Sequence, residues 1–335
     1  MDPFFQSESL KDLYLNFIKD WEANKSIAVN SSGSTGEAKE IFLTKDQLML
    51  SASKTIHFFN LSSGIKALLC LSMNTIAGKM MVARSIVGNW DLTICEPTSN
   101  PLHDLNNDFD FAAFVPLQLQ KIIDEDVEKL KRIKIIIVGG APISNTLENQ
   151  LKTHGITVFQ TFGMTETVSH IALKKIGLQS EKNYKTLTGI TVSEKNDKLI
   201  IDYPEMQKEA FVTNDLVRII GPNEFEWIGR ADFMINSGGI KLNPELIEDK
   251  LNHFIKSPFF ITGIFDEKLG MKLALVIESI ENIHISKKEL QEFLEKYEIP
   301  KVYAILNSFV KTESGKTNRF QTLNLIQPID WKSIY

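Results

Sequence analysis

Three short apolar segments constrain the fold of this chain most. Residues 111–115, 134–138 and 156–160 are almost continuously apolar instead of alternating between apolar and polar. Strands of this kind are buried on both faces, as in parallel sheets that helices cover from either side. Because strand and helix patterns alternate up to about residue 230, the sequence predicts an α/β fold with a mainly parallel sheet.

Other segments fit the same plan. A capping box is formed by Thr44 and Gln47, which predicts a helix beginning there. The remaining elements expected before residue 230 are strands at 26–30, 66–71 and 91–95 and a helix at 80–87.

The pattern changes after Asp232. Asn243 followed by Pro244 is a typical helix start, and Ser286 with Glu289 predicts a second one. Strands are expected at 261–265, 273–278 and 303–309, the last being the final strand. About a hundred residues of this kind suit a small α+β domain. We therefore predict a large α/β domain over 1–231 and a small mobile C-terminal domain over 232–335.

Composition excludes several classes of function. Of 335 residues, 43% are hydrophobic and 24% charged, with a net charge of -5 and no block of like charge. This argues against a nucleic-acid partner. Cys70 and Cys95 are expected to be buried free thiols in a reducing cytoplasm. No signal peptide is recognisable at the start and no apolar run is long enough for membrane insertion, so a cytoplasmic location is expected.

Two loops rich in small residues and lysine stand at opposite ends of the chain. One runs from Ser31 to Lys39 and the other from Lys311 to Arg319. Loops of this kind let backbone N–H groups and hydroxyls surround phosphate oxygens. The spacing differs from the Walker pattern. The alternative for each loop alone is an ordinary surface turn.

Between them lie further candidate segments. The apolar segment 134–138 ends in paired glycines, and segment 159–166 (FQTFGMTE) follows another expected strand. In open α/β sheets, ligands bind at the carboxyl ends of the strands. A tight strand-to-helix turn explains the glycines almost as well.

In this order, the segments resemble the motifs of acyl-activating, adenylate-forming (AMP-binding) enzymes, from residue 26 to 319. The resemblance implies ATP, Mg²⁺ and coenzyme A as small-molecule partners, together with a carboxylic acid. It implies that the β- and γ-phosphates of ATP are bound by Ser32, Ser34, Thr35, Gly36 and Lys39. Ala38 departs from the proline that the family usually carries there.

The second group of implied residues surrounds the nucleotide and the acyl group. Phe162 would stack on adenine beside Gly163, with phenylalanine in place of the family's usual tyrosine. Thr165 would bind the α-phosphate and Glu166 would ligate Mg²⁺. The implied borders of the acyl and adenine pockets are Gly139 and Gly140. Asp215 would bind the ribose hydroxyls, and Arg230 would bind ribose or phosphate.

Three further roles follow from the resemblance. Gly238 and Gly239 would leave room for a narrow thiol tunnel. Lys316 would stabilise the charge that develops when the carboxylate attacks the α-phosphate. Asp232 matches the hinge about which the small domain of the family rotates between the two half-reactions.

The branch of the family is suggested by segments 74–79 and 165–170, which are similar to those of o-succinylbenzoate–CoA ligases of menaquinone biosynthesis. The chain has only about thirty residues before the glycine-rich loop, where most members have many more. Because only one of the two carboxylates of o-succinylbenzoate is activated, the other needs a cation or several donors. The candidates are Lys79, Arg84 and His170.

The expected function is therefore an ATP-dependent carboxylate–CoA ligase, with o-succinylbenzoate as the expected acid. The alternatives are another aryl or fatty acyl–CoA ligase, an enzyme that loads a carrier-protein thiol, or a non-catalytic nucleotide-binding module. Retention of Lys39, Glu166, Arg230 and Lys316 argues against the module. The sequence leaves the oligomeric state open, with a homodimer as one option.

Overall fold

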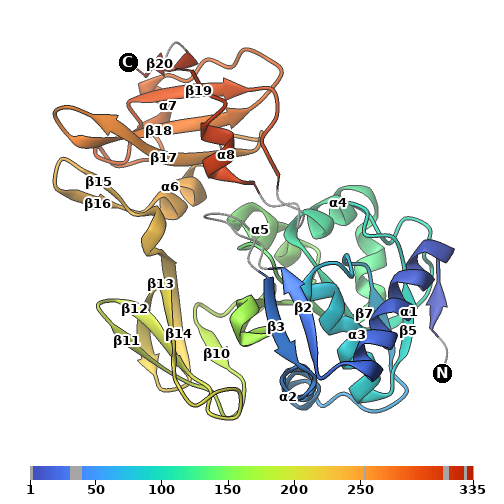
Figure 1. The fold of residues 1–335 in the computed structure, drawn as a ribbon. Coiled ribbons are helices and arrows are strands. Elements are labelled where there is room, and N and C mark those ends of the chain that lie inside the picture. The colour runs from blue at the N-terminus through green and yellow to red at the C-terminus, as the bar shows by residue number, and fades with distance from the viewer. Residues whose placement is uncertain (1–2, 31–39, 253, 312–316, 328–329, 335) are drawn as a thin grey trace.

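The computed structural model describes residues 3–30, 40–252, 254–311, 317–327 and 330–334. Figure 1 shows a large lobe, blue to yellow, and a smaller lobe, orange to red, built from the end of the chain. The helices are α1 (Glu8–Ala23), α2 (Lys45–Phe58), α3 (Ile76–Gly88), α4 (Pro116–Asp126), α5 (Asn145–Thr153), α6 (Pro244–Leu251), α7 (Lys287–Leu290) and α8 (Arg319–Leu323). Short 3-10 helices are η1 (Val127–Arg132), η2 (Thr165–Thr167) and η3 (Ala231–Phe233).

The large sheet has twelve strands within the described residues, in the order β1-β5-β4-β6-β7-β8-β9-β10-β14-β13-β12-β11. Pairing is parallel from β1 to β8 and antiparallel from β8 to β11. The parallel part consists of β1 (Phe4–Phe5), β4 (Lys66–Leu69), β5 (Asp91–Ile94), β6 (Phe109–Phe114), β7 (Ile133–Val138) and β8 (Val158–Gly163). The antiparallel part consists of β9 (His170–Ile176), β10 (Tyr184–Thr186), β11 (Thr191–Lys195), β12 (Lys198–Asp202), β13 (Phe211–Gly221) and β14 (Glu224–Arg230).

Helices cover both faces of the parallel part. On β4, Ala67 and Leu69 lie in the core that α1, α2 and α3 share, while Leu68 lies in the core that α4 and α5 share. Successive side chains of a strand point to opposite faces, so both sets are withdrawn from water. This explains why these strands are continuously apolar, and it confirms the α/β fold class.

The predicted alternation of strands and helices ends well before residue 230. From His170 to Arg230 the described chain forms six strands in succession with no helix between them. The hairpin of β11 and β12 turns through Asn196 and Asp197, which both have positive φ, as two-residue hairpin turns require. The expectation was wrong, because polar turn residues such as Asn196 and Asp197 connect these strands directly as a hairpin.

The second sheet belongs to the end of the chain. Its strands are β15 (Ile235–Ser237), β16 (Ile240–Leu242), β17 (Phe259–Asp266), β18 (Gly270–Glu278), β19 (Val302–Leu306) and β20 (Lys332–Ser333). One face packs on α6 and α7, and the other on α8. The expectation that the strand at 303–309 is the last was wrong, because β20 pairs with β19. The boundary at residues 231 and 232 falls in η3, and the division into two domains stays a prediction.

Helix starts are placed as the capping residues predict. The side chain of Thr44 accepts from the backbone of Gln47, and the side chain of Ser286 accepts from the backbone of Glu289. Asn243 caps α6 with Pro244 at its first turn. These contacts satisfy N–H groups that a helix start leaves unpaired.

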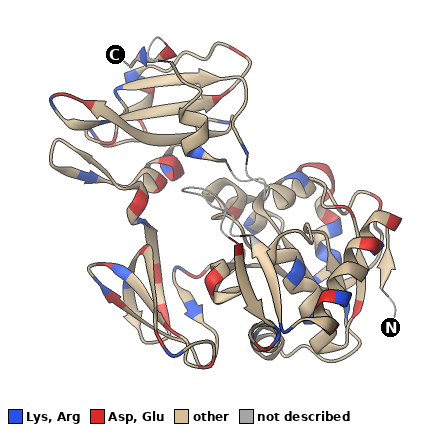
Figure 2. Ribbon diagram, in the orientation of Figure 1, with Lys and Arg blue, Asp and Glu red and all other residues tan. Residues whose placement is uncertain are grey.

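A small two-stranded sheet, β2 (Ser26–Asn30) with β3 (Glu40–Thr44), flanks α2 in Figure 1. Cys70 and Cys95 are buried free thiols, as expected. No helix among the described residues combines the length and apolar character needed to cross a bilayer. Figure 2 shows Lys and Arg interspersed with Asp and Glu along the ribbon.

Candidate active site

The paired glycines stand at the carboxyl end of β7. The N–H of Gly139 donates to the carbonyl of Phe114 on β6 at 3.0 Å. A Cβ atom at residue 139 would lie 2.7 Å from Oγ1 of Thr161, and Gly140 has a φ of 91°. Close approach to β8 and a left-handed backbone therefore account for both glycines. Their role beside the acyl and adenine pockets stays a prediction.

Gly163 ends β8, where the chain bulges against β9. A Cβ atom at Gly163 would lie 2.3 Å from the carbonyl oxygen of Ser169. Glycine is therefore required for β8 to meet the start of β9. The contact between Gly163 and Ser169 brings together the two ends of the loop that carries the predicted phosphate and Mg²⁺ ligands.

That loop contains η2 and a strained turn. Val168 is fully buried with φ 68° and ψ -52°, and the N–H of Ser169 donates to the carbonyl of Thr167 at 2.8 Å. This is a γ-turn with positive φ, which is strained for a β-branched residue. Strain of this kind is concentrated at functional sites, where the surrounding structure imposes it.

The predicted Mg²⁺ ligand projects from the same loop. Glu166 is exposed, and its carboxylate has no hydrogen bond or ion pair with any residue that the structure describes. Thr165 is partly exposed beside it. A carboxylate with no partner among the described residues, next to a hydroxyl, suits a hard cation shared with phosphate oxygens.

Phe162 belongs to an aromatic cluster. Its ring centroid lies 5.5 Å from that of Tyr184 and 5.1 Å from that of Phe225. Both neighbours are buried, whereas Phe162 is half-buried. One part of its ring is therefore fixed by packing while another part stays accessible, which is compatible with the predicted stacking on adenine.

Asp215 and Arg230 are cross-strand partners on β13 and β14. Oδ1 of Asp215 accepts from Nε1 of Trp227 at 3.0 Å, and Oδ2 lies 3.8 Å from the Arg230 guanidinium. Burial raises the pKa of the Asp215 carboxyl, which Trp227 and Arg230 oppose. The guanidinium also pairs with Asp232. The structure thus brings the two predicted nucleotide ligands together.

Gly238 and Gly239 form the turn of the β15–β16 hairpin. Their φ values are 59° and 86°, so both need the left-handed region. A Cβ atom at Gly239 would meet no described heavy atom within 4 Å. Turn geometry alone accounts for these glycines, and the thiol tunnel stays a prediction.

Lys79 lies in the first turns of α3. Its Nζ donates to the carbonyl of Ala28 on β2 at 2.7 Å, and burial lowers the pKa of its ammonium. The ammonium therefore has a backbone partner three residues before Ser31 in the sequence. Its predicted contact with the acid stays a prediction.

Arg84 is the most deeply buried cation near the loop of Val168. The side chain is 2% exposed, and burial lowers its pKa to about 10. Its Nε donates to Oγ1 of Thr55 at 3.2 Å, one terminal nitrogen donates to Oγ of Ser169 at 2.7 Å, and the other faces the sulfur of Met81 at 3.7 Å. None of these partners among the described residues is a carboxylate.

His170 joins the same cluster. Its Nε2 lies 3.2 Å from Oγ1 of Thr55, and its Nδ1 lies 3.5 Å from Oγ of Ser169. Burial lowers the pKa of His170 well below 6.5, and the charge of Arg84 contributes to this shift. The imidazole is therefore neutral at pH 7.

Two polar members of this cluster were missed in the sequence. Thr55 and Ser169 connect Arg84 with His170. A signal for Thr55 exists, because Leu48, Ser51, Ala52 and Thr55 recur at helical spacing and all lie on the buried face of α2. A hydroxyl on such a face needs a polar partner.

The remaining predicted residues lie outside the described residues, so their roles stay predictions. They are Ser32, Ser34, Thr35, Gly36, Lys39 and Lys316.

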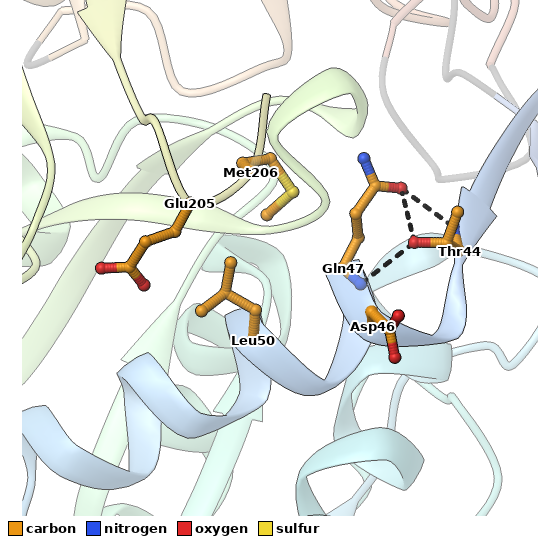
Figure 3. A pocket seen from close by; sticks show the side chains of 6 residues that line it. All are labelled: Thr44, Asp46, Gln47, Leu50, Glu205 and Met206. Carbon is orange, nitrogen blue, oxygen red and sulfur yellow. Dashed lines mark hydrogen bonds between the residues drawn. The ribbon is translucent and has the colours of Figure 1, made fainter. Parts of the chain in front are cut away.

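A pocket of about 470 Å³ lies between the start of α2 and the turn after β12 (Figure 3). None of the predicted site residues lines it. Its lining residues are Thr44, Asp46, Gln47, Leu50, Glu205 and Met206. The Thr44–Gln47 capping box forms one wall, so the polar groups there already satisfy each other.

Comparison with known proteins places these features in a family. Residues 25–209 match the family described as AMP-binding enzyme. The crystal structure of an acyl-CoA synthetase (AMP-forming)/AMP-acid ligase II-like protein from Dyadobacter fermentans is 35% identical, with 95% of each chain covered and a TM-score of 0.63.

Two further relatives carry a narrower name. The 2-succinylbenzoate–CoA ligase of a Geobacillus strain is 25% identical over 88% of this chain and 68% of its own length. The fold also resembles that of the Bacillus subtilis O-succinylbenzoate coenzyme A synthetase in complex with ATP and magnesium ion. That structure has a TM-score of 0.76 at 20% identity, over 88% of this chain and 69% of that one.

Proposed function

Because the chain belongs to the AMP-binding enzyme family, we propose that it is a carboxylate–CoA ligase whose acid is 2-succinylbenzoate. The family assignment makes it an enzyme of the AMP-forming acyl-CoA synthetase group. The narrower substrate is supported by the names of relatives such as the Geobacillus ligase. It is supported independently by the chemistry around Arg84.

The observation that carries the substrate proposal is a buried guanidinium with no carboxylate partner among the residues that the structure describes. Arginine has five N–H donors. The described contacts of Arg84 use Nε–H and one N–H on each terminal nitrogen, one of them only to a thioether. One N–H on each terminal nitrogen is left for another acceptor. Two such donors suit the two oxygens of a carboxylate.

Energetics favour an anion at this position. A buried charge without an opposite charge costs several kcal/mol. Even with its pKa lowered to about 10, Arg84 stays protonated at pH 7. The neutral His170 beside it adds no competing positive charge. A bound carboxylate would therefore offset a cost that the folded protein already bears.

A dicarboxylic acid matches this requirement. Forming the acyl-adenylate consumes the charge of the carboxylate that reacts, so a monocarboxylic acid presents no anion to a distant cation. In 2-succinylbenzoate the ring carboxylate stays ionised throughout. Arg84 would bind this group and thereby orient the succinyl carboxylate toward the α-phosphate.

The nucleotide would be held by residues of β8, of the loop that follows it and of the β13–β14 pair. Phe162 would contact adenine, and Asp215 with Arg230 would bind ribose. Thr165 would bind the α-phosphate and Glu166 would hold Mg²⁺, whose charge would balance that of the phosphates. The glycine-rich loop at 31–39 and Lys316 would complete the phosphate contacts.

Pyrophosphate release and thioester formation over a panel of acids test this proposal. The panel contains 2-succinylbenzoate, 4-oxo-4-phenylbutanoate (which lacks the ring carboxylate), benzoate and palmitate, each with and without CoA. We expect 2-succinylbenzoate to give the highest kcat/KM and to yield a CoA thioester. A preference for any monocarboxylic acid would contradict the proposal that 2-succinylbenzoate is the substrate. Adenylation without CoA transfer would favour a carrier-protein acceptor.

Variants of Arg84 connect the result to the structure. Arg84→Lys keeps the charge but loses the planar fork, so we expect kcat/KM for 2-succinylbenzoate to fall roughly ten- to a hundredfold. The KM for ATP should not change. Arg132→Lys is the matched control, because Arg132 is an exposed arginine paired with Asp108.

A further inference from the structure

Four side chains form a closed hydrogen-bonded ring in the large lobe. Arg84 contacts Thr55 and Ser169, and His170 contacts the same two hydroxyls from the other side. The members come from α3, α2, the end of the Val168 loop and β9. Arg84, Thr55 and His170 are all buried, with Thr55 fully withdrawn from solvent.

The hydroxyl of Thr55 is the centre of this ring. Its Oγ1 lies 3.2 Å from Nε of Arg84, 3.2 Å from Nε2 of His170 and 3.3 Å from the carbonyl oxygen of Ser51. A hydroxyl has one proton and two lone pairs. Since Nε of Arg84 can only donate, one lone pair of Thr55 is committed to the guanidinium in every proton arrangement.

Both neutral tautomers of His170 leave this commitment intact. If Nε2 carries the proton, it donates to Thr55, whose own proton goes to Ser51, and Ser169 donates to Nδ1. If Nδ1 carries the proton, Thr55 donates to Nε2 and Nδ1 donates toward Ser169. In both cases Thr55 accepts from Nε and Ser169 accepts from a terminal nitrogen of Arg84, and these two acceptors together fix the orientation of the planar guanidinium.

We propose that Thr55 is a positioning residue that sets which acid the enzyme prefers. Its hydroxyl fixes the plane of the Arg84 guanidinium, so that the two uncommitted N–H groups are presented together to the second carboxylate of a dicarboxylic acid. Thr55 itself does not touch the acid. This inference rests on the proposed function and deepens it, because it explains how one buried arginine acquires a defined orientation.

Three variants separate positioning from packing. Thr55→Val has nearly the same shape but lacks the hydroxyl, whereas Thr55→Ser keeps the hydroxyl and loses a methyl group. Ser51→Ala is the matched control, because Ser51 is a buried hydroxyl one turn earlier on α2 that makes no described contact with Arg84. For each variant, kcat/KM is measured with 2-succinylbenzoate and with 4-oxo-4-phenylbutanoate, and KM is measured for ATP.

We expect Thr55→Val to lower kcat/KM for 2-succinylbenzoate roughly tenfold, which corresponds to the loss of one hydrogen bond to a charged group. The lower kcat/KM should result from a higher KM for this acid. The values for the monocarboxylic analogue and for ATP should match those of the wild type. Thr55→Ser should restore the preference, and Ser51→Ala should keep it. An equal loss for both acids, or no loss for either, overturns the positioning role.

A second readout does not depend on the acid. In ¹⁵N NMR of the full chain, the Nε–H of Arg84, assigned with Arg84→Lys, should exchange slowly in the wild type and in Thr55→Ser and faster in Thr55→Val. Unchanged exchange in Thr55→Val overturns the Thr55–Arg84 coupling itself. Failure of the proposed function is recognised separately. In that case the wild type itself has the same kcat/KM for the two acids.

Discussion

The backbone N–H of Arg230, at the end of β14, donates to Oε2 of Glu245 in α6 at 2.9 Å. This contact joins the last strand of the large sheet to the first helix of the small lobe. Asn243 adds a second one, from its Nδ2 to the carbonyl of Ile228 at 2.8 Å. Burial raises the pKa of the Glu245 carboxyl. The start of α6 is thus fixed on the strand that carries a predicted nucleotide ligand.

Gly229 makes this contact sterically feasible, so Gly229→Ala should destabilise it. A Cβ atom there would lie 2.4 Å from Nδ2 of Asn243 and 2.7 Å from Oε2 of Glu245, two atoms that hydrogen bonds hold in place. We expect a loss of about 1–3 kcal/mol, seen as a lower melting temperature. Gly221→Ala is the control, because nothing lies within 4 Å of its Cβ position. Equal melting temperatures for the two variants would show that α6 adapts freely.

Lys316 gives a prediction about the two half-reactions. Lys316→Ala should abolish adenylation but spare thioester formation from presynthesised acyl-adenylate. Loss of a preorganised charge contact in a transition state typically costs on the order of 10²–10³ in rate. Pyrophosphate release and single-turnover CoA transfer measure the two steps. Equal losses in both would refute a role restricted to adenylation.

Gly239 tests the predicted thiol tunnel against simple turn geometry. Gly239→Leu should slow CoA transfer while adenylate still forms, if the space beside this residue admits the pantetheine arm. Because φ is 86°, the variant also carries backbone strain. Gly64→Leu has similar strain at φ 77° with nothing near its Cβ position, in a loop of the large lobe. Similar CoA-transfer rates in both variants would remove support for the tunnel.

Lys79 and Arg84 make competing predictions about the ring carboxylate. If Lys79 holds it, Lys79→Ala should weaken use of 2-succinylbenzoate roughly ten- to a hundredfold and spare the monocarboxylic analogue. If Arg84 holds it, Lys79→Ala should change both acids by the same factor, because Lys79 then only donates to Ala28. The ratio of kcat/KM for the two acids decides between them. A constant ratio assigns Lys79 a structural role.

Local chemistry made much of the fold predictable. The apolar segments of β6 and β7 and the capping boxes at Thr44 and Ser286 determine structure through neighbours in sequence. The succession of strands after His170 was not predicted, because β11 and β12 are short and bury only alternate residues, which gives a weaker apolar signal than the continuous segments of β6 and β7. Sequence also could not show that α2 delivers Thr55 to Arg84, since that contact depends on how two helices pack.

The candidate site was predictable to different degrees. Asp215 and Arg230 were named from a motif, and strand register explains why they meet. Arg84 was one of three candidates for the second carboxylate, and burial now distinguishes it from Lys79. Lys174 on β9, whose ammonium lies 5.0 Å from the ring centroid of Tyr184 on β10, had no recognisable signal, and neither had Tyr184. Burial lowers the pKa of Lys174 and raises that of Tyr184. Their environments arise from packing between strands distant in sequence.

His170 should make stability fall at mildly acidic pH. Its pKa in the folded protein lies well below 6.5, because the imidazole is buried beside Arg84. Protons therefore bind the unfolded chain more tightly, and stability falls as pH decreases through 6.5 toward the folded pKa. The slope can reach about 1.4 kcal/mol per pH unit. His170→Asn should lose this part of the pH dependence, measured as melting temperature between pH 7.5 and 5.5. His57→Asn is the control, because His57 is exposed. If the wild type and His170→Asn lose the same stability over this range, His170 is not held neutral by the fold.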